Sequence, residues 1–468
     1  MVFLVFLPPI LWSAAFFTSV REFRQNLRPI GLLAVGLVFV TTAAVALASH
    51  LLFPGIPWAV AVAIGAIVSP PDAVAAAAIV SRLPVPRRVV VILEGESLVN
   101  DAAALVLYRT AVVAAVTGAF SLGEAIVRFF IDAGVGALVG LTVGWIVVRA
   151  IRWTNDSLAE TLLTIAAPYL AWVAAESLHV SAVLACVAGG IYVRQHFSTA
   201  VSAMSRLQSR AVWDLLVFLI NALIFLILGM EFGPLMKEVP AGTLHSVLLS
   251  GVAISMVAII VRLLWVPLAT YLPRRLSADM RRRDPVPDPK GVALVAWTGM
   301  RGIVSLAAAL GLPLALSSGE PFPYRAEIIL VTMCVIMITL VVQGLTLAPV
   351  IKRFAFTPDL TRVEEEHHAR REALRRGVEA LDDLSREHWA DAEEVAELRH
   401  ELHHRMQHEQ RHGRDSASRR RLRMGVVKAE RRMLVRLRNE GAISDETLRE
   451  LEQELDHESV RVGAGDER

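Results

Sequence analysis

The feature that most constrains this chain is a series of apolar runs, each long enough to cross a lipid bilayer. They follow one another with short interruptions from residue 1 to about residue 352. Because a helix of about 20 apolar residues matches the thickness of the hydrocarbon core, each run predicts a transmembrane helix. We predict about eleven spans, approximately at 2–19, 29–52, 57–80, 89–117, 123–149, 158–177, 180–195, 211–233, 242–272, 290–316 and 325–351.

The chain changes character near Lys352, after which Arg, Glu, Asp and His become frequent. We therefore predict an all-α polytopic membrane domain over residues 1–352 and a charged, helical tail over residues 353–468. The formal net charge of +2 does not indicate nucleic-acid binding. Cys186 and Cys334 both lie in apolar runs, which predicts neither a disulfide nor a metal site. No motif of a soluble enzyme or of a resident cofactor is present, so we expect a protein that is not an enzyme.

Basic residues are unevenly distributed over the loops. Arginines follow the first, third, fifth, seventh and ninth predicted spans. In the loops after the even-numbered spans, the only Lys or Arg residues are Lys237 and Arg325. Cytoplasmic loops are enriched in Lys and Arg, so we expect a cell-membrane protein with its tail in the cytoplasm and its N-terminus outside. An odd number of spans also places the two ends on opposite sides. The first apolar run has no charged region or cleavage motif before it, which predicts a span rather than a signal peptide.

Three carboxylates stand at the start of the fourth apolar run, in the sequence EGESLVND at 94–101. Ionisable groups inside a membrane span are costly and mark ion or proton pathways. On a helix, Glu94, Ser97 and Asp101 share one stripe, and Glu96 and Asn100 share a neighbouring stripe. We expect Ser97 and Asp101 to be able to ligate a cation. The alternative is an interfacial helix start with solvated acids; Glu94 fits that alternative best, at the cytoplasmic mouth.

Two of the predicted spans contain helix-breaking residues. The third contains the sequence SPPD at 69–72, and the tenth contains Arg301 between Gly299 and Gly302. Two consecutive prolines remove two amide donors and free two carbonyls. Transporters bind cations at such breaks, which lipid tolerates only when they are buried in protein or line a wet cavity. We predict two related halves with Asp72 at the ion site; a packing kink capped by Asp72 is an alternative compatible with that role.

The ninth predicted span contains an arginine, Arg262, within an otherwise apolar sequence. An arginine at this depth is expensive unless a carboxylate pairs with it, and Glu96 is the best candidate partner. The alternative is that the Arg262 side chain extends to the cytoplasmic interface.

Histidines are concentrated in the tail, which contains nine of the chain's thirteen. One cluster comprises His400, His403, His404, His408 and His412. A solvated helical face is the first interpretation. A cytoplasmic pH sensor is the second, and a metal site is the third.

Together, these motifs resemble the sodium/proton exchanger branch of the monovalent cation:proton antiporter family. The resemblance rests on FLPP at 6–9, SPPD at 69–72, the acidic sequence at 94–101 and GMRG at 299–302. It implies an inverted-repeat antiporter bundle in which two broken helices cross. It also implies a homodimer in which a core domain moves against a scaffold.

The resemblance also implies roles for individual residues. Asp101 would bind the cation and the proton, with Ser97 and Asp72 assisting. Asn100 and Asp101 resemble the Asn-Asp pair of the electroneutral branch, so Asn100 belongs to the same expected site. The only metal expected is the transported Na⁺ itself.

Three further residues match supporting positions of the family. Glu96 and Arg262 would form its structural ion pair, and Arg301 would be the arginine of the second broken helix. The chain also departs from the pattern: Pro71 replaces a threonine ligand, and Ser13 replaces a glutamate that often joins the ion site. Family members usually have about two more spans before this point, so we expect a chain that lacks the first spans.

We therefore expect secondary active, electroneutral exchange of Na⁺ (or Li⁺ or K⁺) for H⁺ by alternating access, serving pH and cation homeostasis. The proton and the cation would compete for Asp101, because a hard cation takes oxygen ligands. A K⁺/H⁺ antiporter, a channel and a truncated, non-transporting membrane sensor are the alternatives. The costly buried charges argue against the sensor, which would not need them.

Overall fold

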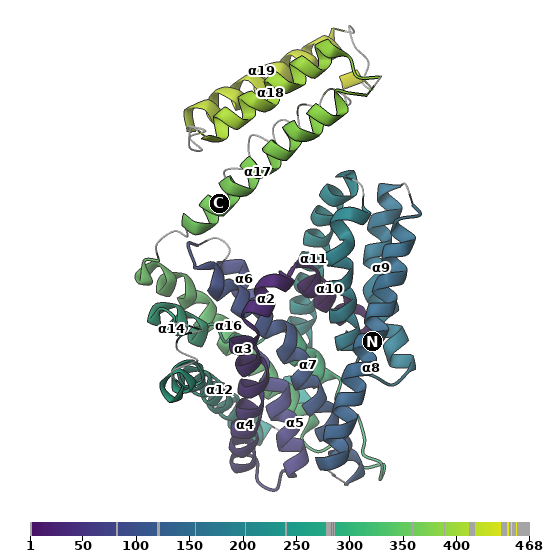
Figure 1. Ribbon diagram of the computed structural model, residues 1–468. Helices are drawn as coiled ribbons and strands as arrows, with labels where there is room; N and C mark the ends of the chain where they lie inside the picture. The colour runs from purple at the N-terminus through teal and green to yellow at the C-terminus, as the bar shows by residue number, and fades with distance from the viewer. Residues whose placement is uncertain are drawn as a thin grey trace. The chain divides into compact units, whose positions relative to one another are not determined.

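The computed structural model is built from helices (Figure 1). It describes residues 2–440 except 81–82, 119–121, 155, 202, 239–240, 278–281, 283, 285, 357–359, 388 and 411–416, together with 447–448, 451 and 455. Within these residues there is no β-strand, and only an isolated bridge joins Ala315 to Pro321. The predicted all-α fold class is confirmed. The chain divides into two compact units, Met1–Pro358 and Asp359–Arg468, which are considered separately.

The first unit contains helices in every range that the sequence analysis assigned to a span. Their bounds are α1 (Val2–Phe17), α2 (Val20–Gln25), α3 (Leu27–Gly31), the π-helix η1 (Leu32–Leu37), α4 (Val38–Leu52), α5 (Trp58–Val68), α6 (Ala73–Val80), α7 (Arg87–Thr117), α8 (Leu122–Ile151), α9 (Ser157–Ser177), α10 (Ala182–Ala200), α11 (Ala203–Glu238), α12 (Ala241–Leu276), α14 (Pro289–Trp297), α15 (Ile303–Leu310) and α16 (Arg325–Phe354).

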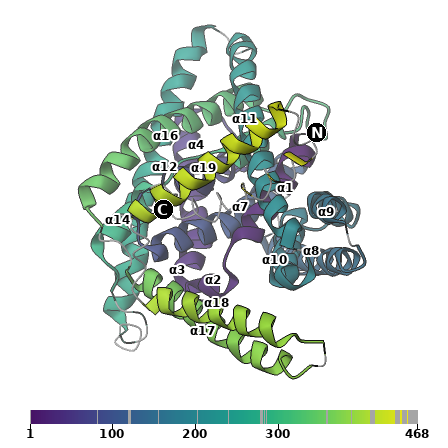
Figure 2. The ribbon, with the colours of Figure 1, turned by 90° about the horizontal axis from the view of Figure 1, so that it is seen from above.

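Helices of the first unit gather into two groups (Figures 1 and 2). The scaffold group consists of α1, α8, α9 and α10, which pack on one another. The crossing group consists of α3 to α7, α12 and α14 to α16, in which α12 packs against α4, α14 and α16. Helix α11 contacts both groups, and α1 reaches across to α7 and α15. The fold therefore has an internal boundary between two helix groups.

Large apolar side chains cover much of the outer surface of this unit. On α8, for example, Leu138 and Trp145 are 62% and 57% exposed. Contiguous exposed apolar surface of this kind is typical of a face that meets lipid. Five helices of the described part are long and apolar enough to cross a membrane: Leu27–Leu52, Phe130–Ile151, Ser157–Ser177, Thr243–Leu276 and Arg325–Phe354. The total number of spans and the domain boundary at residue 352 stay predictions.

The chain leaves the helical conformation inside two of the apolar segments. Helix α5 ends at Val68 and α6 begins at Ala73, because Pro70 and Pro71 have no amide to donate to the preceding turn. Helix α14 ends at Trp297 and α15 begins at Ile303. These two breaks lie inside the crossing group, where α15 packs against α5.

The described residues of the second unit include α17 (Leu360–Leu384), α18 (Ala392–Gln410) and α19 (Ala417–Asn439). Helices α17 and α18 pack together, and Arg399 donates to Asp382 at 2.5 Å. His400, His403 and His404 lie exposed on α18, whereas His412 lies outside the described residues. Among the residues that the structure describes, no group of three or more His, Cys, Asp or Glu could hold a metal ion.

Candidate functional site: a cavity at two crossed helix breaks

The two helix breaks hold each other through hydrogen bonds between their backbones and one side chain. The amide of Asp72, in the first break, donates to the carbonyl of Met300, in the second, at 2.7 Å. In the other direction, Nε of Arg301, in the second break, donates to the carbonyl of Val68, before the first break, at 2.6 Å. In a continuous helix the Asp72 amide would have donated to this same Val68 carbonyl, four residues earlier. Each break thus satisfies backbone groups that the other leaves open, as a buried break requires.

Arg301 is 1% exposed, and its side chain donates to carbonyl groups. Besides Val68, its Nη1 donates to the carbonyl of Gly299 at 2.5 Å, and its backbone amide donates to Oγ1 of Thr339 at 3.0 Å. Val68 is the last residue of α5, and Gly299 lies two residues beyond the end of α14, so both carbonyls are at or just after a helix C-terminus, where the dipole favours a positive charge. Arg301 therefore holds the two C-terminal ends close together at the crossing.

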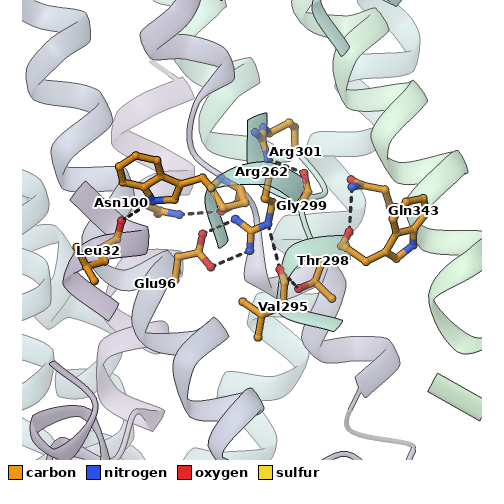
Figure 3. A network of polar contacts seen from close by, with 12 residues as sticks. Leu32, Glu96, Asn100, Arg262, Val295, Thr298, Gly299, Arg301 and Gln343 are labelled. Atoms are coloured by element: carbon orange, nitrogen blue, oxygen red, sulfur yellow. Dashed lines mark hydrogen bonds and ion pairs between the residues drawn. The ribbon is translucent and has the colours of Figure 1, made fainter. Parts of the chain in front are cut away.

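A buried ion pair between α7 and α12 lies near the crossing (Figure 3). Arg262 on α12 donates to both carboxylate oxygens of Glu96 on α7, with Nη2 to Oε2 at 2.8 Å. Each side chain is 1% exposed, so Arg262 does not extend to the interface. Arg262 Nε also donates to the carbonyl of Val295 at 3.2 Å. Gly299 leaves room for this arginine, because a Cβ there would lie 2.6 Å from its Cδ.

A small cavity of about 30 Å³ lies beside the crossed breaks. Its volume is enough for about two water-sized occupants. Its polar side consists of two carboxylates and two hydroxyls, from Asp72, Ser97, Asp101 and Ser305. The part of its lining that comes from α1 is apolar, with Ile10, Leu11 and Ala14. The cavity therefore lies at the boundary between the crossing group and the scaffold group.

Two carboxylates share this cavity. Asp101 is 7% exposed and interacts electrostatically with Asp72, which is half-buried at the start of α6. Two acids in one small, partly apolar space repel each other when both are charged. A bound cation or proton relieves that repulsion, so the arrangement can hold a hard monovalent cation through oxygen ligands.

Asn100 has a different place from the other predicted site residues. It is fully buried, and its Nδ2 donates to the carbonyl of Pro71 at 3.2 Å. Its side-chain amide therefore links α7 to the first break. Asn100 is not among the residues that line the cavity. Glu94 also lies outside the lining; it is half-buried within electrostatic reach of Arg87 and Glu22.

Two residues at the site, Ser305 and Thr339, have no role predicted from the sequence, and Gly302, predicted there as a helix breaker, makes a contact that was not expected. A Cβ on Gly302 would lie 1.8 Å from Oδ2 of Asp72, so this carboxylate packs directly against the glycine backbone. Ser305 is 1% exposed, and its Oγ has no hydrogen-bond partner among the described residues. Thr339 accepts the Arg301 amide. Ser305 and Thr339 are polar residues in apolar helices, which is the signal that could have identified them.

Comparison with known proteins is consistent with this geometry. The family model described as "Sodium/hydrogen exchanger, transmembrane" matches residues 1–353. An uncharacterized Na⁺/H⁺ exchanger of Mycobacterium tuberculosis H37Rv is 34% identical over 98% of this chain and 86% of the relative. The sodium, potassium, lithium and rubidium/H⁺ antiporter of Bacillus subtilis strain 168 is 31% identical over 96% and 69%, respectively.

A solved structure shows the same fold. The sodium proton antiporter MjNhaP1 from Methanocaldococcus jannaschii at pH 8 superposes with a TM-score of 0.58 at 19% identity. The match covers 74% of this chain and 83% of that chain. This likeness confirms the predicted antiporter bundle.

Proposed function

Because the chain belongs to the sodium/hydrogen exchanger family, we propose that it exchanges Na⁺ for H⁺ across the cell membrane, electroneutrally and by alternating access. The observation that carries this proposal is the cavity in which Asp72 and Asp101 face an apolar wall of α1. We place the tail in the cytoplasm and the N-terminus outside, as the arginine distribution indicates. The exposed apolar faces of the scaffold group are available for a homodimer.

The proposed binding step is a competition for one carboxylate. Asp101 holds either a proton or a cation, and Asp72, Ser97 and Ser305 offer further oxygen ligands. A hard monovalent cation such as Na⁺ prefers such oxygens. The cation must lose water to enter a cavity of about 30 Å³, and the two carboxylates offset that loss of hydration.

The proposed transport step is a movement of the crossing group relative to α1. The wall that α1 presents is apolar, so a charged, empty cavity is costly to carry along it. A bound proton or cation lowers the charge of the cavity and permits the movement. Exchange follows because the loaded states move and the unloaded state does not.

The proposed stoichiometry is one proton for one monovalent cation. Asn100 carries no charge, and its amide is engaged with the Pro71 carbonyl, so it takes no part in proton uptake. The same carboxylate then releases one occupant when it takes the other, and no net charge crosses the membrane.

The test is exchange by the purified chain in proteoliposomes that contain a pH-sensitive dye. We expect Asp101→Asn to reduce Na⁺-driven proton flux to the level of protein-free vesicles. Asp214→Asn is the matched control, because Asp214 is exposed on α11 and lies outside the cavity lining; it should keep the flux of the original chain. Full flux in a correctly folded Asp101→Asn variant would show that the carboxylate assignment is wrong.

Broad selectivity among alkali cations, including K⁺/H⁺ exchange, is the second candidate. The Bacillus subtilis relative is named for sodium, potassium, lithium and rubidium. In this chain Pro71 offers no side-chain hydroxyl at the first break, so fewer fixed ligands define the size of the cation. The same vesicles, given Na⁺, Li⁺, K⁺ or Rb⁺ in turn, distinguish a selective exchanger from a broad one.

A further inference from the structure

A second and larger cavity opens at the arginine-rich end of the crossing group, separate from the cavity lined by Asp72 and Asp101, which we call the ion cavity after its proposed role. Its volume is about 190 Å³, and no lining residue is shared with the ion cavity. Helices α3, α7, α12 and α14 and the π-helix η1 form its walls. These walls are mostly apolar, with Leu32, Leu33, Val89, Ile92, Val266 and Val292. We call this cavity the arginine groove.

The rim of the arginine groove carries three arginines that converge on one carboxylate. Arg88 donates to Asp284 at 2.8 Å, and the Arg28 guanidinium lies 3.7 Å from the same side chain. Arg274 donates to the Asp284 carboxylate and also to its backbone carbonyl, the latter at 3.2 Å. The lining contains two carboxylates, Asp284 and Asp288, against three guanidiniums, so the groove keeps an excess of positive charge.

The arginines differ in how much of their donor capacity remains available. The Arg274 side chain is 6% exposed and is also bonded to the carbonyl of Thr270. Arg28 and Arg88 remain 31% and 42% exposed. The other acid of the lining, Asp288, accepts the amide of Lys290 at 3.2 Å and caps α14. Arg28 and Arg88 are therefore the groups that can receive an anion.

We propose that the arginine groove binds an anionic phospholipid, with the phosphate on Arg28 and Arg88 and part of an acyl chain along the apolar walls. Guanidinium is the side-chain group best suited to phosphate, and basic residues beside membrane helices attract anionic headgroups. The groove also extends beyond the reach of a free phosphate. From Asp288 at the rim to Val295 it follows α14 for about 10 Å, at 1.5 Å per residue.

The deep end of the arginine groove meets the buried ion pair. Val295 lines the groove, and its carbonyl accepts Nε of Arg262 at 3.2 Å. A bound acyl chain would therefore pack between the helices that hold Glu96 and Arg262 in place. The lipid would stabilise the crossing group without entering the ion cavity.

The experiment measures lipid retention and thermal unfolding of the full chain, purified in a neutral detergent. Added phosphatidylglycerol should be retained in native mass spectrometry and should raise the unfolding midpoint by about 3 °C, because it binds the folded state alone. Phosphatidylcholine should do neither at the same concentration. Combined Arg28→Gln and Arg88→Gln should weaken phosphatidylglycerol binding at least about fivefold for each arginine removed.

Two further variants, and inorganic phosphate tested in place of the lipid, make the result decisive. Combined Arg21→Gln and Arg24→Gln is the matched control, since these arginines are exposed on α2, outside the groove lining, and should leave binding unchanged. Ala269→Phe fills the groove without changing its charge and should also abolish retention. Equal binding by the Arg28/Arg88 variant, equal effects of phosphatidylcholine, or full stabilisation by inorganic phosphate alone would each overturn the proposal.

Discussion

The substitution Glu96→Gln tests how much the buried ion pair contributes to the stability of the fold. It removes the negative charge and leaves the Arg262 guanidinium buried, because both side chains are 1% exposed. Uncompensated burial of one member of such a pair costs about 3–5 kcal/mol. That cost lowers the ratio of folded to unfolded protein by about two to four powers of ten. The measurement is equilibrium unfolding in mixed micelles, followed by tryptophan fluorescence.

Two further variants decide whether the cost arises from the buried charge. Glu176→Gln breaks the surface pair between Arg109 and Glu176, whose charged groups are 3.4 Å apart and whose side chains are 53% and 51% exposed. It should lower the free energy of unfolding by less than about 1 kcal/mol. Glu96→Gln combined with Arg262→Met removes both charges and should be more stable than Glu96→Gln alone, because no unpaired charge then remains buried. A cost below about 1 kcal/mol for Glu96→Gln, or a double variant no more stable than the single one, would refute this reasoning.

Further substitutions probe the crossing. Gly302→Ala places a methyl group 1.8 Å from a carboxylate oxygen of the ion cavity and should slow exchange in proteoliposomes at least about tenfold; Gly344→Ala, whose Cβ would have its nearest neighbour at 3.6 Å, should not. Arg301→Gln removes a charged donor from a buried carbonyl and should lower the free energy of unfolding by about 1.5–3 kcal/mol. Asn100→Asp can keep the bond to the Pro71 carbonyl only while protonated, so exchange by this variant should fall as pH rises.

The sequence was sufficient to select residues whose neighbours follow from helical spacing. Ser97 and Asp101 share one stripe of α7, and the structure places both on the ion cavity with Asp72. The cost of a lone buried arginine likewise led from Arg262 to Glu96, which are bonded in the structure. In these cases a local rule, either periodicity or charge balance, restricted the possible partners.

Other parts of the site depend on how two distant breaks cross, which no local rule describes. Arg301 was expected in the second broken helix, but its side-chain hydrogen-bond partners, the carbonyls of Val68 and Gly299, were not. Ser305 lines the same cavity as Asp72 because the second break, from which α15 begins, is bonded to the first break. Every residue has a backbone carbonyl, so residue types alone do not indicate which carbonyls will accept hydrogen bonds from the other break.

The ion cavity is asymmetric, and this asymmetry bears on how binding is coupled to movement. All of its charged and hydroxyl groups belong to the crossing group, whereas α1 contributes an apolar wall. Even the Ser13 hydroxyl of α1 is turned to its own helix, where it donates to the Ile10 carbonyl at 2.9 Å. A relative movement of the two groups therefore breaks no ligand bond between them. In the proposed transport step, the barrier then depends on the charge that moves past the apolar wall, and the occupant of the cavity sets that charge.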